Sequence, residues 1–366
     1  MKKLIFAAAG SAGHLEPALA VARWIRENAP EYTCEFVISD LGVENQLLAN
    51  EAFTVHRITK AAMPRRINLD ALLWPIRFTQ SLIKVRSALV GADAAIGFGG
   101  YICAPTYVMG KLLRVPLVVH EANVLPGWAN RLGVKLGAKG LIAFEATKGM
   151  DKNFAHSTLV GMPLRDAIYA AANLSPSQRL ALRSNWLKEH GLDPARKVIL
   201  IFGGSLGSRA INEVVAKALP DLKRGGLQLI HIVGGKNALP AKSEGYLPLS
   251  YLNDMASALI SADLVISRSG AVTCAELAAL AKYALLIPLE IGNGEQKYNA
   301  SVLESAGIAT IISNSAFSEH YLSAHLIRLL KVADERESAR PDLSSIVHPH
   351  AVEAIGHSLI KAAGGR

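Results

Sequence analysis

The stretch KLIFAAAGSAGHLEPALAVA, residues 3–22, decides how the chain begins. An apolar run over residues 4–9 leads into a turn that contains Gly10 and Gly13, and apolar residues then recur at helical spacing after His14. The run of six apolar residues is shorter than the roughly 7–15 residues of the apolar core of a secretory signal. We therefore expect a strand, a glycine turn and a helix here, and not a cleaved signal peptide.

The composition indicates a globular protein of two domains. A chain of 366 residues is long for a single core, and 51% hydrophobic with 19% charged residues does not suit a disordered tail. No apolar run approaches the roughly 20 residues of a membrane-spanning helix. Cys34, Cys103 and Cys274 are odd in number and far apart, which argues against a disulfide framework or a zinc site and suits a reducing cytosol.

The net charge of +9 is concentrated in one segment of the first half. Residues 52–92 contain seven basic residues and a single acidic one, Asp70, and they include the apolar and aromatic stretch LDALLWPIRFTQSLIKV. Such a segment suits contact with an anionic membrane surface. It suits equally an amphipathic helix that packs on its own sheet and exposes a basic face to solvent. It contains no recognisable nucleic-acid reader motif, so we expect no nucleic-acid partner.

Strand and helix signals alternate along the chain in two series. The first series of apolar strand signals is KLIFAAA, CEFVISD, AAIGFGG, PLVVHEA, GLIAF and STLVG, and the second is KVILIFGGS, LQLIHIVGG, DLVISRSG, YALLIPLE and IATIIS. Continuous apolar runs between helices indicate parallel sheets covered on both faces. We predict two Rossmann-like, doubly wound α/β domains that face a cleft, over residues 1–162 and 163–347, with 348–366 packed back on the first.

The glycine turns that follow these strands are candidate ligand sites. Ligands of doubly wound sheets bind outside the carboxyl ends of the strands, where glycine turns and helix starts can hold an anion. GGSLGSR (203–209) and RSGAVTCAE (268–276) suit a diphosphate, and Glu276 suits the two hydroxyls of a ribose. Neither stretch is a dinucleotide or P-loop motif, and the chain has no Asp-x-Asp pair, so Arg165 and helix dipoles would replace a metal.

His14 is a candidate general base, because it ends the first glycine turn at the start of a helix. Position alone leaves a structural or merely exposed histidine as the alternative.

Taken together, these stretches resemble the MurG family of membrane-associated glycosyltransferases. The family's usual first loop, Gly-Gly-Thr-Gly-Gly-His, is matched by Ala9-Gly10-Ser11-Ala12-Gly13-His14. Further segments match in the family's order: GFGGYICAP (97–105), HEANVLPGWANR (120–131), GMPLR (161–165), GGSLGSRAINE (203–213), YLNDM (251–255) and RSGAVTCAELA (268–278).

The resemblance implies a GT-B fold, an inverting transfer, and no cofactor or obligatory metal. The donor would be UDP-N-acetylglucosamine, and the acceptor undecaprenyl-diphosphate-linked MurNAc-pentapeptide (lipid I), converted to lipid II at the cytoplasmic face of the membrane by a peripheral enzyme. His14 would be the general base, with His120 and Glu121 in reserve. The implied donor-site residues are Ser11, Ala12, Gly13, Asn123, Arg165, Ser205, Leu252, Ala271, Val272, Thr273, Cys274, Ala275, Glu276 and Gln296.

Several positions depart from the family pattern. Ala9 and Ala12 stand where glycines are usual, and alanine would strain a left-handed turn. Glu295 precedes Gln296 where an amide or histidine is usual, and Ala122 stands where glutamine is frequent. Ala281-Lys282-Tyr283 replaces a common Gly-x-Pro.

Three other functions remain open for such a chain. A diacylglycerol glycosyltransferase would share the fold, the donor and the membrane contact. An epimerase of UDP-GlcNAc would act without an acceptor, and a non-catalytic nucleotide-sugar-binding subunit would bind UDP without turnover.

Overall fold

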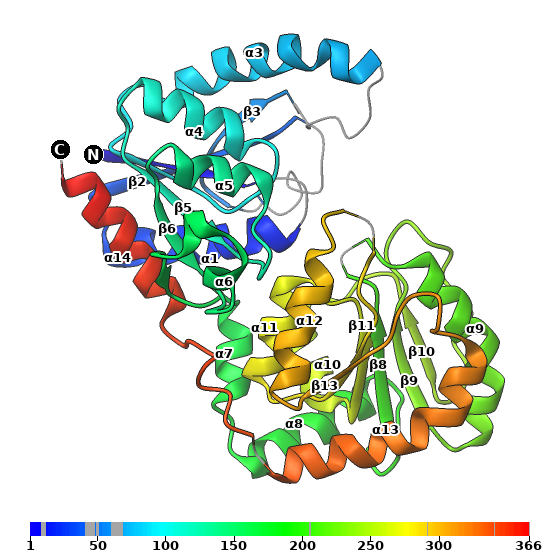
Figure 1. The fold of residues 1–366 in the computed structure, drawn as a ribbon. Helices are drawn as coiled ribbons and strands as arrows, with labels where there is room; N and C mark the ends of the chain where they lie inside the picture. The colour runs from blue at the N-terminus through cyan, green and yellow to red at the C-terminus, as the bar shows by residue number, and fades with distance from the viewer. Residues whose placement is uncertain are drawn as a thin grey trace. The chain divides into compact units, whose positions relative to one another are not determined.

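The computed structural model describes residues 1–8, 12–40, 48, 51–59, 69–204, 206–290, 292–339 and 341–365, with the backbone alone at 12 and 69–71. The chain divides into two compact units. The N-terminal unit is Met1–Arg165 with His348–Arg366, and the C-terminal unit is Asp166–Val347. Each unit is an α/β domain around one parallel sheet, as Figure 1 shows.

The sheet of the N-terminal unit has the strand order β3-β2-β1-β4-β5-β6-β7, and its neighbouring strands are parallel. Its strands are β1 (Lys2–Ala7), β2 (Tyr32–Ser39), β3 (Thr54–Ile58), β4 (Ala94–Gly97), β5 (Leu117–Glu121), β6 (Lys139–Ile142) and β7 (Thr158–Leu159). The order reverses between β1 and β4, so the loops that follow these two strands flank the ligand-binding position of a doubly wound sheet.

Helices cover both faces of this sheet. They are α1 (Ala12–Asn28), α3 (Leu69–Leu89), α4 (Cys103–Leu112), α5 (Trp128–Lys135), α6 (Thr147–Met150) and α14 (Ala351–Gly364), with a 3₁₀ turn at Lys152–Phe154. Side chains of β1 alternate between the two cores: Leu4 and Phe6 belong to one cluster, and Ile5 to the other. All three are fully buried, and each such side chain stabilises the fold by about 1.5–3 kcal/mol.

Helix α14 returns the end of the chain to the N-terminal unit and lies beside α1 (Figure 1). Gly356 permits this contact, because a Cβ at that position would lie 2.5 Å from the indole ring of Trp24. Ile355 and Leu359 of α14 are fully buried in the same core as Leu15 of α1.

The C-terminal unit repeats this topology with the strand order β10-β9-β8-β11-β12-β13, again all parallel. Its strands are β8 (Val198–Phe202), β9 (Gln228–Ile232), β10 (Tyr246–Leu249), β11 (Leu264–Ser267), β12 (Ala284–Leu286) and β13 (Ala309–Ile311). Its helices are α7 (Asp166–Ala172), α8 (Pro176–Glu189), α9 (Arg209–Arg224), α10 (Met255–Ser261), α11 (Ala271–Ala279), α12 (Glu295–Ser305) and α13 (Glu319–Ala339). The predicted fold class, two Rossmann-like domains, is confirmed.

The sequence analysis missed one edge strand in each sheet, β3 and β10. Strand β3 is partly exposed and reads TVHRI, so it has no apolar run. Strand β10 contains Pro248, which edge strands tolerate because one side of the backbone needs no ladder hydrogen bond.

Candidate active site

His14 is the third residue of α1 and lies at the carboxyl edge of the N-terminal sheet. Its half-buried imidazole lies against Gly99, because a Cβ on Gly99 would be 2.9 Å from both Cε1 and Nδ1 of the ring. Gly99 and Gly100 follow β4 and have φ of 106° and 89°, which favour glycine. His14 and the GFGG segment therefore meet at the switch point of the sheet.

Part of this loop lies outside the described residues, namely Ala9, Gly10 and Ser11. Ala12 and Gly13 are the first two residues of α1, so their backbone amides belong to a helix N-terminus, which attracts anions. Ala12 therefore takes the place of the usual glycine within a helix, where alanine is favoured.

Glu121 organises the loop that follows β5. Its side chain is buried and accepts hydrogen bonds from the backbone amides of Asn123 and Gly127, each at 2.9 Å, and from Nδ2 of Asn130 at 3.0 Å. Tyr107 donates to Oδ1 of Asn130 at 2.9 Å and completes the buried group. Glu121 thus holds Asn123 in place, and its enclosure argues against a role as general base.

His120 is also enclosed. It is 0% exposed, its Nε2 lies 3.0 Å from the carbonyl oxygen of Gly161, and its ring packs beside Phe98. Burial lowers the pKa of His120 to about 4. Of His14 at the start of α1 and His120 within β5, only His14 is accessible enough to meet a substrate hydroxyl.

In the C-terminal unit, the loop between β8 and α9 packs closely on the loop that follows β9. A Cβ on Gly207 would lie 2.0 Å from the carbonyl oxygen of Val233, and a Cβ on Gly234 would lie 2.5 Å from the backbone of Gly207. The hydroxyl of Ser208 caps α9 by accepting from Ile211 N at 3.4 Å. Ser205, the predicted diphosphate ligand of this loop, lies outside the described residues.

Arg268 connects this loop by hydrogen bonds to the segments that follow β12 and β13, a role that the sequence analysis did not predict. Its Nη2 donates to Ser208 Oγ at 3.0 Å and to Asn314 Oδ1 at 2.7 Å, and its Nη1 donates to the carbonyl oxygen of Ile287 at 3.0 Å. Arg268 is 7% exposed, and burial lowers its pKa. A buried cation after β11 therefore holds together the ends of β8, β12 and β13.

Helix α11 presents its N-terminus at the same edge of the C-terminal sheet. Gly270 is its N-cap and provides no side-chain cap, so the first backbone amides remain available to a ligand. Of the predicted donor residues, Val272 and Thr273 are half-buried, whereas the side chains of Ala271, Cys274, Ala275 and Glu276 are buried. Burial also raises the pKa of the Cys274 thiol, so this cysteine is inert.

Gln296 lies in the first turn of α12. Its Oε1 accepts from the backbone amide of Leu289 at 3.0 Å, and its backbone oxygen accepts from Ser269 Oγ at 2.8 Å. This arrangement engages the amide oxygen of the side chain within the protein. Glu295 turns back on its own loop, accepting from Asn293 N at 3.1 Å, and its negative charge suits a helix N-terminus.

The remaining predicted residues lie on connections between elements. Leu252 is half-buried between β10 and the Asp254 cap of α10, and Arg165 is the half-buried last residue before α7. Among the described residues, no group of three or more His, Cys, Asp or Glu side chains is arranged to hold a metal ion.

Helix α3 carries an exposed apolar stripe within the basic segment. Leu72, Ile76 and Ile83 are 74%, 58% and 67% exposed, and at helical spacing they lie within about 40° of one another around the axis. The opposite face, including Val85 and Leu89, is fully buried on the sheet. Lys84 and Arg86 are exposed beside the stripe, whereas Lys60, Arg65 and Arg66 lie outside the described residues.

The chain matches two family models along most of its length. Residues 4–141 match the glycosyltransferase family 28 N-terminal domain, and residues 198–348 match the glycosyltransferase family 28 C-terminal domain. A protein of Corynebacterium glutamicum is 41% identical over 322 residues, which cover 87% of each chain. It is named UDP-N-acetylglucosamine–N-acetylmuramyl-(pentapeptide) pyrophosphoryl-undecaprenol N-acetylglucosamine transferase. A protein of Frankia casuarinae has the same name and is 36% identical, and the match covers 100% of this chain and 97% of that protein.

The chain is a MurG-family glycosyltransferase of family 28. Its fold is similar to the crystal structure of Acinetobacter baumannii MurG, with a TM-score of 0.73, 25% identity and coverage of 99% of this chain and 100% of the other. The predicted family resemblance is therefore confirmed.

A UDP-GlcNAc 2-epimerase from Neisseria meningitidis is also similar to the MurG-family chain, with a TM-score of 0.64, coverage of 98% of this chain and 100% of the other, and 13% identity. At that identity the likeness concerns the fold alone. In the described part of the chain, no helix is both long and apolar enough to cross a membrane.

Proposed function

We propose that this protein transfers N-acetylglucosamine from UDP-GlcNAc to the 4-hydroxyl of undecaprenyl-diphospho-MurNAc-pentapeptide, converting lipid I to lipid II in peptidoglycan synthesis. The observation that carries this proposal is the match, along nearly the whole chain, to relatives named for this transfer. The site geometry supports it, because the accessible histidine and the anion-binding helix starts lie at the carboxyl edges of their sheets.

His14 is the proposed general base. Its half-buried imidazole accepts the proton of the muramyl 4-hydroxyl as the oxygen attacks the anomeric carbon of GlcNAc. The bond from that carbon to the UDP oxygen breaks, UDP leaves with the electron pair, and the configuration inverts. General-base help of this kind contributes about 10²–10⁴-fold to the rate.

The C-terminal domain is the proposed donor domain. The starts of α9 and α11, with Ser205 and Arg165, receive the diphosphate, because backbone amides at helix starts stabilise its charge. The carboxylate of Glu276 accepts hydrogen bonds from the ribose hydroxyls. The main chain of Leu252 contacts uracil, and the NH₂ group of Gln296 donates a hydrogen bond to the sugar. In the N-terminal domain, the proposed donor-binding residues are Ser11, Ala12, Gly13 and Asn123.

The N-terminal domain is the proposed acceptor domain, and α3 is its membrane contact. The stripe of Leu72, Ile76 and Ile83 would enter the headgroup region, while Lys84 and Arg86 meet anionic lipid. In this proposal the enzyme is a peripheral protein of the cytoplasmic face of the cell membrane, with no nucleic-acid partner and no cofactor.

The test is transfer of labelled GlcNAc from UDP-GlcNAc to a lipid I analogue, with EDTA present and diacylglycerol as the alternative acceptor. We expect transfer to the lipid I analogue alone. Transfer to diacylglycerol, or conversion of UDP-GlcNAc without any acceptor, would replace this proposal with a lipid glycosyltransferase or an epimerase.

A further inference from the structure

A cavity of about 610 Å³ opens in the C-terminal domain at the edge of the sheet opposite the proposed donor site. Two of its lining residues, Asp263 and Lys282, come just before β11 and β12, whereas the donor residues follow the carboxyl ends of the strands. Helix α11 separates the two places, with Gly270 at one end and Ala281 near the other. Its nine residues span about 13 Å.

Lys282 is the unusual residue of this cavity. It is 7% exposed, and its Nζ donates to the carbonyl oxygen of Ala262 at 3.0 Å. The nearest carboxylate, Glu337, lies 3.7 Å from Nζ and is itself mostly exposed. Burial lowers the pKa of Lys282, so this ammonium is poorly compensated in the described part of the chain.

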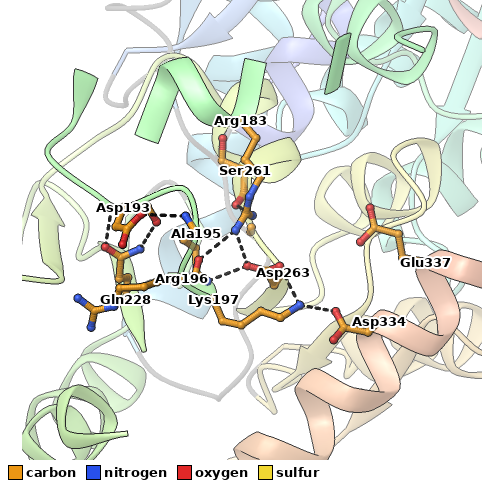
Figure 2. Close-up of polar contacts among 12 residues, drawn as sticks. Arg183, Asp193, Ala195, Arg196, Lys197, Gln228, Ser261, Asp263, Asp334 and Glu337 are labelled. Atoms are coloured by element: carbon orange, nitrogen blue, oxygen red, sulfur yellow. Dashed lines mark hydrogen bonds and ion pairs between the residues drawn. The ribbon is translucent and has the colours of Figure 1, made fainter. Parts of the chain in front are cut away.

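The other carboxylate of the cavity, Asp263, already has several hydrogen-bond and ion-pair partners. Its Oδ2 accepts from Arg183 at 2.9 Å and from the backbone amide of Val198 at 2.7 Å, and its Oδ1 lies 3.2 Å from Nζ of Lys197. Figure 2 shows this group, with Asp334 and Glu337 projecting toward it from α13. Asp263 therefore divides its single charge among Arg183, Lys197 and Lys282, and it pairs directly with only the first two.

Arg179 adds a second cation to the cavity wall. It donates to the carbonyl oxygens of Ala172, Leu174 and Leu280, which lie at helix ends, and so uses three of the five N–H groups of a guanidinium. The lining as a whole has three cationic side chains and two carboxylates, which leaves one positive charge in excess.

The rest of the wall is apolar. Leu174, Leu180 and Ile260 line it, and Leu180 is 67% exposed at the surface. The volume lies within the range of about 300–1,000 Å³ that small-molecule sites occupy.

We propose that this cavity is a second ligand site, which binds a small amphiphilic molecule with one anionic head group, a phosphate or a carboxylate. The head group lies on Lys282 and Arg179 and supplies the charge that Lys282 lacks. The apolar part packs against Leu174, Leu180 and Ile260. This site is separate from the donor site and takes no part in the proposed transfer.

Isothermal titration calorimetry of the full chain tests the proposal, with hexyl phosphate and hexanoate as probes and excess UDP present to fill the donor site. We expect one saturable site for at least one probe, with hexan-1-ol and inorganic phosphate each binding more weakly. Preference between the two probes identifies the head group. Because binding is measured and not turnover, the result is independent of the transferase proposal.

Two variants localise the binding, and one serves as a control. Lys282→Met should weaken binding by at least about tenfold, because a charge-assisted hydrogen bond is lost. Leu180→Glu places a carboxylate at the exposed rim and should also weaken binding without affecting the core. Lys188→Met removes an exposed lysine of the same helix, α8, and should change nothing.

Absence of saturable binding by both probes would overturn the proposal. So would unchanged affinity in a folded Lys282→Met protein. If Lys282→Met does not fold, Leu180→Glu decides, since unchanged affinity there places the probe elsewhere.

Discussion

His14 packs against Gly99 across the switch point of the N-terminal sheet, so closely that a Cβ on residue 99 would lie 2.9 Å from the imidazole and the ring would have to shift. The two residues are 85 positions apart in the chain. His14 lies in the first turn of α1, after β1, and Gly99 lies in the loop after the adjacent strand β4. Gly99 therefore sets the position of the imidazole that we propose as the general base.

Gly99→Ala should lower kcat by about 10–10²-fold, because the added methyl group displaces the His14 ring from its reactive position. The matched control is Gly91→Ala. Gly91 also has a positive φ, of 73°, but a Cβ there meets nothing within 4 Å, so this variant introduces a positive-φ alanine without a steric clash. Steady-state kinetics of both variants, alone and with His14→Ala, test the coupling. An equal loss from Gly99→Ala in the presence and absence of His14 would contradict it.

Glu276→Gln should raise KM for UDP-GlcNAc by about tenfold with a smaller effect on kcat, because a ribose contact is made in the ground state and the transition state alike. Glutamine retains the volume of this buried side chain. The decisive measurement is binding of UDP against 2′-deoxy-UDP, which the unaltered protein should discriminate and the variant should not. Glu213→Gln, at an exposed site on α9, is the control. A large loss of kcat, with an unchanged KM for UDP-GlcNAc and an unchanged preference for UDP over 2′-deoxy-UDP, would assign Glu276 another role.

Ile83→Glu should weaken binding to vesicles that contain anionic lipid, and the remaining binding should fall as salt concentration rises. Ile327→Glu is a close control, because Ile327 is 67% exposed, like Ile83, but lies on α13 of the other domain. Vesicle co-sedimentation provides the measurement. Equal loss in both variants, or equal binding to neutral and anionic vesicles at all salt concentrations, would exclude α3 as an electrostatic membrane contact.

Acid should destabilise the protein through two buried histidines, His120 and His231. Burial lowers the pKa of each to about 4, whereas histidine in an unfolded chain titrates near 6.5. Because the folded pKa is the lower one, protons favour the unfolded chain. The stabilisation is complete above about pH 6.5 and falls toward pH 4, by at most about 1.4 kcal/mol per pH unit for each histidine.

His231→Gln tests the pH effect at one of these sites. His231 lies 3.0 Å from both Tyr246 Oη and Asn212 Oδ1, and glutamine retains hydrogen-bonding capacity without titrating. Urea unfolding midpoints at pH 7, 5.5 and 4.5 should fall less steeply in the variant than in the unaltered protein. Parallel pH profiles would show that His231 does not contribute.

Ala281→Gly should stabilise the C-terminal domain by roughly 0.5–1 kcal/mol. Ala281 has φ of 53°, in the left-handed region, which costs alanine about 1–2 kcal/mol, partly offset by the greater freedom of glycine in the unfolded chain. The melting temperature of the variant should therefore rise. Ala279→Gly, at the last residue of α11 where φ is not positive, should lower it. A fall in both variants would mean that the turn is not strained.

The sequence alone determined the family, the parallel α/β class and the central strands of both sheets, because buried parallel strands are continuous apolar runs whatever lies around them. The sequence analysis did not identify the edge strands β3 and β10, because an edge strand is paired on one side only and needs no continuous apolar run. The sequence also nominated His14 as general base, with His120 in reserve. Only the tertiary structure separated them, because burial depends on neighbours distant in the chain. His14 lies half-buried against Gly99, whereas His120 is enclosed beside Phe98 and Gly161. The same reason explains Arg268 and Lys282, whose partners come from several strands and helices that only folding brings together.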